Sequence, residues 1–370
     1  MQKVILRKAS YAYETLRPAI FGVMSALDNG QISKGRRVLI KPNLLAPATP
    51  ERAMVTHPLV VKAVAEYVHE KGGNIQVSDS PAMGSFEKVL KESGIRKALE
   101  DFPVDFREFK NSVEVSVGEP FKKIEVAEDA LSADVVINVP KLKTHAQMLL
   151  TLGVKNLFGC IVGLRKPEWH LRAGVEKERF AQLLIQIYKT ICPSITIMDG
   201  ILAMEGQGPG RSGVPRELGL IIGSSDALAL DITVTRMLGL KPEMLLTNKV
   251  AADMGLAPEK IEVDGEAPVI RDFRLPVIGP VIFGPPALHG FMRRHFVQRP
   301  HVNGRLCKQC GECWKYCPAK AITPEGKKIT FDYDRCIRCF CCIEVCPHGA
   351  LKTVETLPGK VLRKITKRHR

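Results

Sequence analysis

Apolar and amphipathic stretches alternate along the first three hundred residues. Helical spacing of apolar residues predicts a helix behind a Thr56 cap that stops at Gly72, and further helices at 85–101 and 177–192. Short apolar runs predict strands at residues 37–40, 74–77, 134–139, 195–198 and 218–222. This alternation predicts an α/β fold with a mostly parallel sheet and flanking helices.

Chemically unusual residues follow directly after these predicted strands, in the segments 41–45, 78–84, 140–145, 199–210 and 223–231. The carboxyl ends of parallel strands lie along one edge of a sheet, so we expect their side chains to converge on one crevice. The candidate catalytic residues are His145, Lys143 and Lys41. The candidate substrate-binding residues are Asn43, Asp79, Lys141, Lys155, Asn156 and Asp199.

The segment from Pro140 to Pro167 is rich in lysine and contains no acidic residue. This imbalance favours a small anionic ligand such as a carboxylate or phosphate, held by lysine charge and glycine amides. A basic loop without a ligand is the alternative. His145 is a candidate proton donor or acceptor near neutral pH, with a structural role as the alternative. Asp79, Asp199, Glu205, Asp226 and Asp231 are candidates for metal or hydroxyl binding, with helix caps or turns as the alternative, especially for Asp226 and Asp79.

The C-terminal region contains a doubled cysteine pattern. Each copy reads C-x-x-C-x-x-C-x-x-x-C-P, from Cys307 to Pro318 and from Cys336 to Pro347. In such a run the fourth cysteine ligates the other cluster, so the pattern predicts two [4Fe-4S] clusters with crossed ligation. The predicted ligands are Cys307, Cys310, Cys313 and Cys346 for cluster one, and Cys336, Cys339, Cys342 and Cys317 for cluster two.

A zinc ribbon also uses paired cysteines, but two quartets with a following proline favour iron–sulfur clusters. Cys341 lies outside the pattern and is interpreted as a packed spare thiol, because Cys342 keeps the spacing of the first copy. The segment from Arg305 to Val354 resembles bacterial-type ferredoxins with two [4Fe-4S] clusters. That resemblance implies cofactor and fold, and it leaves the redox partner open.

A second resemblance covers roughly residues 1 to 290. The motifs KPNLL, THP, SDSP, PKLKTH with VKNLFG after it, and MDGI together resemble the family catalogued as domain of unknown function 362. The resemblance implies an α/β domain in cytoplasmic iron–sulfur proteins, often joined to a ferredoxin module. It implies no established reaction.

These signals divide the chain into four predicted parts. Residues 1–270 form the α/β ligand-binding domain, 271–300 a proline-rich packed linker, 301–355 the small α+β ferredoxin-like domain, and 356–370 a basic tail with basic residues at helical spacing. The longest apolar run, at 275–288, is too short to cross a bilayer and is broken by prolines, so no transmembrane segment is predicted. Without an apolar signal region after Met1, the chain is predicted to be cytoplasmic.

The formal net charge of +15 falls to about +11 once each oxidised cluster and its four thiolates contribute a net charge of about −2. Charge alone is a weak argument for nucleic-acid binding, because no recognition motif accompanies it. The basic tail is interpreted as a solvated segment, with binding of an acidic redox partner protein, anionic lipid or RNA as the alternatives. For the basic stretch before the cysteines, contact with a membrane surface is the alternative.

Two functions remain open from the sequence. In the first, single electrons pass between the clusters and a small anionic substrate in the α/β domain, which makes the chain a candidate iron–sulfur oxidoreductase. A two-electron reaction then draws on both clusters or on a mediating flavin, which no sequence motif indicates. In the second, the chain relays electrons to a separate enzyme and docks on it without chemistry of its own. The substrate, the direction of electron flow, the cluster potentials and the oligomeric state are not encoded in any recognisable pattern.

Overall fold

A computed structural model describes residues 1–276 and 286–361 of the chain. Residues 277–285 of the predicted linker at 271–300, and residues 362–370 of the predicted basic tail at 356–370, lie outside the described residues. Its strands are β1 Gln2–Lys8, β2 Arg37–Pro42, β3 Asn74–Val77, β4 Val104–Phe106, β5 Ser112–Gly118, β6 Lys122–Ala127, β7 Val135–Val139, β8 Lys141–His145, β9 Leu149–Thr151, β10 Ile195–Gly206, β11 Gly213–Ser224, β12 Ile261–Asp264, β13 Arg299–Val302, β14 Ile322–Glu325, β15 Lys328–Phe331 and β16 Leu351–Val354.

The helices cover both faces of the main sheet and also form part of the C-terminal module. They are α1 Tyr13–Leu27, α2 Pro58–Glu70, α3 Phe86–Glu92, α4 Ile95–Ala98, α5 Glu128–Ser132, α6 Gly153–Asn156, α7 Arg165–Ala173, α8 Lys177–Ile191, α9 Ala227–Met237, α10 Leu246–Asp253, α11 Pro286–His295, α12 Glu312–Lys315 and α13 Cys341–Glu344, with 3₁₀ turns η1 Pro50–Arg52, η2 Leu157–Cys160 and η3 Pro242–Met244. None of the helices in the described parts of the chain is long and apolar enough to cross a membrane.

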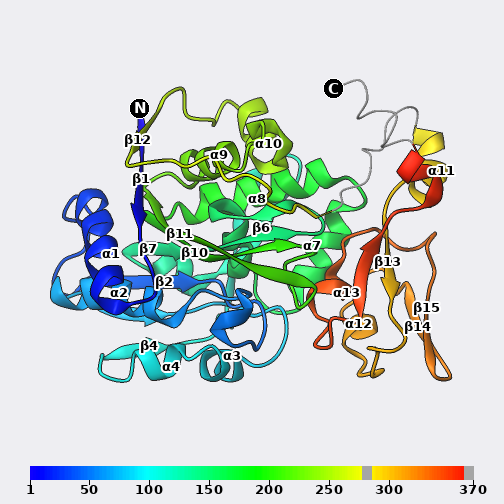
Figure 1. Cartoon of the computed structure of the whole chain (residues 1–370), viewed down its shortest axis with the longest axis horizontal. Coiled ribbons are helices and arrows are strands. Elements are labelled where there is room, and N and C mark those ends of the chain that lie inside the picture. Colours follow the sequence, from blue (N-terminus) through cyan, green and yellow to red (C-terminus); the bar gives the residue numbers. More distant parts are fainter. Residues whose placement is uncertain (277–285, 362–370) are drawn as a thin grey trace.

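The main sheet has the strand order β12-β1-β11-β10-β7-β2-β3-β4, and β8 and β9 branch from β10. Neighbouring strands from β10 through β7, β2 and β3 to β4 run parallel, whereas β11 is antiparallel to both β1 and β10. Helices α1 and α2 pack on one face, and α8, α9 and α10 lie over the other (Figure 1). The predicted mostly parallel α/β sheet is confirmed.

The sheet strands are buried because their apolar residues face helices on both sides. Val135, Ile137 and Val139 of β7 point into the core shared with α1 and α2, and Val136 joins the core shared with α8. Helix α2 fits its prediction closely, ending before Gly72, whose φ of +76° favours glycine. Its cap was predicted wrongly: the His57 side chain accepts the cap hydrogen bond, from the Leu59 amide.

The C-terminal module packs against the turn that joins the end of β10 to the start of β11, with α13 closest to it (Figure 1). The turn between the two strands touches α13 so closely that a Cβ on Gly210 would lie 3.3 Å from the Ile343 carbonyl oxygen. Ser212 Oγ donates to the Leu351 carbonyl at 3.1 Å, and Gln298 Nε2 donates to the Ala146 carbonyl at 3.2 Å. These contacts fix the module over the sheet edge where the polar residues lie.

Candidate functional site

A cavity with about 720 Å³ of empty volume, its mouth included, lies between the sheet edge and the C-terminal module. Its floor and walls come from the segments after β2, β3 and β8, from η2 and from α7. The module closes it with Tyr316, Cys341, Glu344 and Val345. The cavity is therefore shared by the two parts of the chain, and the sequence pattern had pointed to only one of them.

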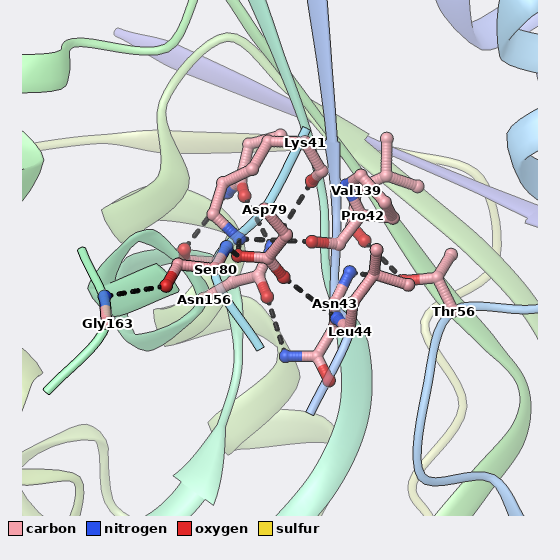
Figure 2. A network of polar contacts seen from close by, with 12 residues as sticks. Lys41, Pro42, Asn43, Leu44, Thr56, Asp79, Ser80, Val139, Asn156 and Gly163 are labelled. Carbon is pink, nitrogen blue, oxygen red and sulfur yellow. Dashed lines mark hydrogen bonds and ion pairs between the residues drawn. The ribbon is translucent and has the colours of Figure 1, made fainter. Parts of the chain in front are cut away.

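A buried ion pair lies at the edge of the cavity, where Asp79 is one of the lining residues. Lys41 Nζ lies 2.9 Å from Asp79 Oδ1, and neither side chain is more than 4% exposed. Asp79 Oδ2 also accepts the Leu44 amide at 2.9 Å (Figure 2). Gly159 lies against this pair: a Cβ there would fall 2.1 Å from Asp79 Oδ1. The pair is electrically neutral, and of its two members Asp79 lines the cavity whereas Lys41 lies behind it, so Lys41 is not a free cation of the site.

A chain of hydrogen-bonded asparagine side chains positions the second lysine, Lys143. Lys143 Nζ donates to Asn43 Oδ1 at 2.6 Å and to the Met54 carbonyl at 2.7 Å. Asn43 Nδ2 donates to Asn156 Oδ1 at 2.7 Å, and Asn156 in turn donates to Asn138 at 2.8 Å. All these acceptors are neutral, so they orient the ammonium group of Lys143 without cancelling its charge. Burial lowers the pKa of Lys143 to about 7.

Three other polar atoms in the cavity wall have no hydrogen-bond partner among the described residues. They are Lys166 Nζ, His170 Nδ1 and Thr151 Oγ1, and each side chain is more than nine-tenths buried. Buried polar groups in folded proteins are almost always paired with protein, water or a ligand. Burial lowers the pKa of Lys166 to about 7, because few compensating charges surround it. Together these atoms indicate a binding site.

Lys155 supplies a third ammonium group. Its Nζ lies 4.9 Å from the Phe158 ring centroid and 5.6 Å from that of Phe180, within range of a cation–π interaction. Burial lowers its pKa, and Glu344 partly offsets the effect. The two rings bind its charge weakly, so an anion in the cavity can still attract it.

His145 connects the sheet edge to the module. Its Nδ1 accepts the Gln147 and Met148 amides at 3.1 and 3.2 Å, so the proton of the neutral ring is on Nε2. Nε2 lies 3.0 Å from Glu344 Oε1. Burial alone would raise the pKa of Glu344, but its interaction and hydrogen bond with His145, followed by the attraction of Lys155, hold that pKa at about 2. These contacts give His145 a positioning role and leave neither nitrogen aimed at open space.

The cavity therefore has an excess of positive charge. Lys41 and Asp79 cancel, and the carboxylate of Glu344 faces the three ammonium groups of Lys143, Lys155 and Lys166. The balance of the lining favours an anion of one or two negative charges. An anion would also satisfy the unpartnered nitrogen of Lys166, which no neutral water can do as strongly.

Two predicted binding residues lie outside this cavity. Lys141 Nζ contacts Asp199 Oδ2 at 2.8 Å and the Tyr11 hydroxyl at 2.9 Å. Asp199 also accepts the His57 amide at 2.9 Å, and the rings of Tyr11 and His57 stack with their centroids 3.5 Å apart. Every charge in this group is paired, so it holds β8, β10 and the start of α2 together.

Asp226 and Asp231 are also away from the cavity. Because β11 runs antiparallel, the segment that follows it leaves at the opposite edge of the sheet. Asp226 caps α9 by accepting the Leu228 amide at 2.8 Å, and Asp231 accepts the Gly153 amide at 2.7 Å. The predicted convergence was wrong for this strand, because only the other four predicted strands run parallel to one another. Lys141 and Asp199, which follow two of those four strands, do not line the cavity either.

The cysteines gather into two groups that match the predicted crossed sets. One cavity of about 310 Å³ is lined by the cysteines at 307, 310, 313 and 346, and another of about 330 Å³ by those at 317, 336, 339 and 342. The fourth cysteine of each run thus lies with the other run. The Ala350 amide donates to Cys346 Sγ and the Ala321 amide to Cys317 Sγ, each at 3.3 Å, as expected around thiolates that ligate a cluster. These donor sets fit two [4Fe-4S] clusters.

Six of the nine predicted catalytic and binding residues line the cavity: Asn43, Asp79, Lys143, His145, Lys155 and Asn156. Sequence reasoning missed Cys341, Glu344 and Tyr316 as cavity residues, because no pattern indicates which face of the module meets the sheet. Lys166 and His170 belong to the acid-free segment and its continuation, so composition was the signal that could have found them.

Comparison with known proteins finds two family models that match separate parts of the chain. The model of the domain of unknown function DUF362 matches residues 38–236, and that of a 4Fe-4S dicluster domain matches residues 299–347. The chain belongs to the DUF362 family. It therefore combines a DUF362 domain with a 4Fe-4S domain, and the iron–sulfur prediction is confirmed over the zinc alternative.

Some relatives match most of this chain, and others match only a short stretch of it. The thylakoid-associated protein sll1697 of Synechocystis is 38% identical over 303 residues, spanning 80% of this chain and 94% of that protein. The pyruvate synthase subunit PorD of Thermotoga maritima is 42% identical over 57 residues, 15% of this chain and 58% of that subunit. The lactate racemase apoprotein of Thermoanaerobacterium thermosaccharolyticum aligns at 13% identity with a TM-score of 0.41, over 60% of this chain and 54% of that one.

Proposed function

We propose that this chain is an iron–sulfur redox protein in which single electrons pass between the 4Fe-4S module and a small anionic substrate bound in the DUF362 domain. One observation carries the proposal: the lysine-rich cavity is closed by Cys341 and Glu344, which belong to the cysteine run of the module. A ligand there contacts the wall that also surrounds the cysteines at 317, 336, 339 and 342.

In this proposal, some residues of the cavity bind the anion and another transfers a proton. Lys166 and Lys155 attract the anion, and Thr151 and His170 offer it further polar contacts. Lys143 Nζ, held by Asn43 and with a pKa of about 7, can give or take a proton near neutral pH. When bound, the clusters supply or accept electrons one at a time. Lys143 and Lys166 are buried between the sheet and the module, and burial strengthens the charge interactions of their ammonium groups.

The proposal is tested with anaerobically prepared holoprotein. The protein is reduced with dithionite, freed of excess reductant, and mixed with each member of a panel of small carboxylates and phosphates while the visible iron–sulfur absorbance is followed. We expect at least one anion to reoxidise the wild type, and Lys166→Met to slow that reaction at least tenfold. Lys260→Met, an exposed change of equal charge, serves as the control. Equal rates for every anion and for buffer would contradict the proposal.

A second candidate function is electron delivery to a separate enzyme. It is favoured by the similarity of the module to PorD and to the ketoisovalerate oxidoreductase subunit VorD of Pyrococcus furiosus, 48% identical over 40 residues, 10% of this chain and 37% of that subunit. Cys310 is exposed among the exposed basic residues Arg305, Lys308 and Lys315, which suits an acidic partner. Removal of residues 356–370 tests this reading: slower electron delivery to a co-purifying partner supports it, and unchanged delivery opposes a role for the tail.

A cytoplasmic location remains part of the proposal, with contact to a membrane surface as its variant. The Synechocystis relative is named for association with thylakoids. In this chain, α11 exposes 59% of Phe291 beside the exposed Arg294, and His295 of the same helix accepts a hydrogen bond from Thr356, next to the exposed Leu357. Sedimentation with anionic lipid vesicles tests the variant, with Phe291→Ser expected to reduce binding; equal binding of both proteins would oppose it.

A further inference from the structure

The contacts of Lys143 differ from those of two other buried lysines on the same strands. Lys41 and Lys141 each form an ion pair with a buried aspartate, at 2.9 and 2.8 Å, which favours the ammonium form of both. The hydrogen-bond partners of Lys143 are neutral instead: the side-chain oxygen of Asn43 and the carbonyl oxygen of Met54. Neither contact requires the amine of Lys143 to stay protonated.

The two hydrogen bonds also orient the amine of Lys143 once it is neutral. Its Nζ lies 2.6 Å from Asn43 Oδ1 and 2.7 Å from the Met54 carbonyl oxygen. An ammonium group has three N–H donors, so two remain after the loss of one proton. The two acceptors use both of them, and the lone pair takes the remaining direction. Lys143 lines the lysine-rich cavity, so this lone pair belongs to an oriented amine in the cavity wall.

Burial makes the neutral amine available near neutral pH. It lowers the pKa of Lys143 to about 7, so that both protonation forms are populated there. The charged groups around it are Glu344, Lys155, Asp79 and Lys141. An ordinary lysine, with a pKa of about 10.4, is almost entirely protonated at the same pH. Desolvated lysines of this kind form Schiff bases with carbonyl compounds.

The same cavity contains groups that suit an anion with a carbonyl group. Lys166 Nζ and Thr151 Oγ1 are buried in its wall without hydrogen-bond partners among the described residues. An ammonium group and a hydroxyl donor suit a carboxylate. Glu344 also lines the cavity, and its negative charge suits an iminium ion formed on Lys143. A small carboxylate that also carries a carbonyl group, such as a 2-oxo acid, uses all of these groups.

We propose that Lys143 is a catalytic nucleophile that forms a Schiff base with a small oxo acid bound in the cavity. Its Nζ forms a bond to the carbonyl carbon as the carbonyl double bond opens. The carbonyl oxygen then leaves as water, with one proton from the amine and one from the solvent. The N–H of the resulting iminium keeps one of the two hydrogen bonds, to Asn43 or to the Met54 carbonyl. No electron is transferred in this step.

The inference rests on the anion site of the proposed function, but not on its electron transfer. Schiff-base formation is neither an oxidation nor a reduction, so it takes place while the clusters stay oxidised. Reoxidation of the reduced protein by an anion, without any adduct, would contradict this inference and leave the proposed function standing. An adduct on Lys143 without reoxidation by any anion would do the reverse.

The test traps the Schiff base in oxidised, anaerobically purified holoprotein. The protein is incubated with pyruvate, glyoxylate or 2-oxoglutarate and with cyanoborohydride, which reduces the imine to a stable secondary amine, and peptide mass spectrometry locates the adduct. With at least one of the three acids, Lys143 should be labelled about tenfold or more faster than the exposed Lys260, because more of its amine is neutral. Acetone, which has the carbonyl without the carboxylate, should label Lys143 more slowly than that acid.

Lys143→Arg keeps a positive charge without a nucleophilic amine, so it should lose the fast adduct, whereas the control Lys260→Met should retain it. Two results would overturn the proposal. One is labelling of Lys143 no faster than that of Lys260 with all three acids. The other is a fast adduct on Lys166, whose amine has no acceptor to orient it among the described residues. The map of the wild-type protein decides both, even if Lys143→Arg does not fold.

Discussion

At the scale of single residues, the difference between paired and unpaired lysines governs the site. Lys41 and Lys166 are both buried, yet Lys41 Nζ lies 2.9 Å from Asp79 Oδ1 whereas Lys166 Nζ has no hydrogen-bond partner in the described part of the chain. A buried ammonium group that keeps its charge without a partner is costly, so a bound anion gains much of its affinity by supplying one. Lys41 therefore has a structural role, and Lys166 is the lysine that we propose binds the anion.

Anion affinity should depend on pH through Lys143 and Lys166, whose pKa values are both about 7. The ammonium forms that attract an anion are present below pH 7 and are lost above it. Asp79, Lys41, Cys160 and Glu108 face Lys166 and set its charge environment. Affinity for oxalate should be steady near pH 6. Above pH 7 it should fall about tenfold per pH unit for each of the two lysines that loses its proton.

Calorimetric titration of the holoprotein with oxalate between pH 6 and pH 8.5 measures this dependence. His170 does not interfere, because burial lowers its pKa to about 3 and it stays neutral throughout this range. An affinity that is flat across the interval would show that neither lysine titrates where the structure places it.

Lys41→Met should destabilise the domain, because it leaves the carboxylate of Asp79 buried without its cation. The expected loss in the free energy of unfolding is about 3–5 kcal/mol. Urea unfolding under anaerobic conditions measures it. The double change Lys41→Met with Asp79→Asn should recover part of the loss, since it removes the uncompensated charge. Equal stability of Lys41→Met and the wild type would contradict the account of this pair.

The cluster ligands could be predicted from the sequence more completely than the contacts of the lysines. The spacing of the cysteines along the chain predicts which of them bind each cluster, so the two sets of four could be assigned from the sequence. The structure places the same cysteines together. The lysines could be placed near a sheet edge from strand ends alone. Their partners could not, because the contact of Lys41 with Asp79 joins two segments that are neighbours only once β2 and β3 pair.

At the scale of elements, the 3₁₀ turn η2 brings the site together. Its Gly159 packs directly against the Lys41–Asp79 pair, and its Phe158 ring lies next to the ammonium group of Lys155. Sequence periodicity predicted β7 and α8 on either side of this region, but not the short α6 and η2 between them. Elements of one turn have no periodic signal, and their form depends on buried contacts such as that of the Gly153 amide with Asp231.

Gly159→Ala should disrupt the site through sterics alone. Its Cβ would lie 2.1 Å from Asp79 Oδ1 and 2.5 Å from Lys41 Nζ, so the turn or the ion pair must shift. We expect a loss of oxalate affinity of at least tenfold and a lower melting temperature. Gly22→Ala in α1 is the matched control, because its Cβ would meet nothing within 4 Å, and it should leave affinity unchanged. Wild-type affinity in Gly159→Ala would refute the tight packing of η2.

At the scale of the whole molecule, the position of the C-terminal module completes the cavity. The sequence showed two units, each with its own pattern, and gave no sign of how they face one another. The contact is made by close backbone approach at Gly210 and by polar contacts such as His145 with Glu344. Such surfaces have no periodicity, which explains why the module residues of the site were missed.

Gly210→Val should push the module away from the sheet edge without unfolding either part. A Cβ there already lies 3.3 Å from the Ile343 carbonyl, and the branched side chain adds to the crowding. We expect full iron content, faster hydrogen exchange at α13 and weaker oxalate binding. Gly304→Val, whose Cβ would meet nothing within 4 Å, is the control. Unchanged exchange and affinity would mean that the module does not need this contact.

The most direct test of the central claim is an anaerobic crystal structure of the holoprotein, solved as purified and again after soaking with oxalate. The account predicts anion density in the cavity between η2 and α13, within hydrogen-bonding distance of Lys166 Nζ and beside the cluster held by the cysteines at 317, 336, 339 and 342. A cavity that contains only water in both crystals, with Lys166 paired to another protein group, would contradict it.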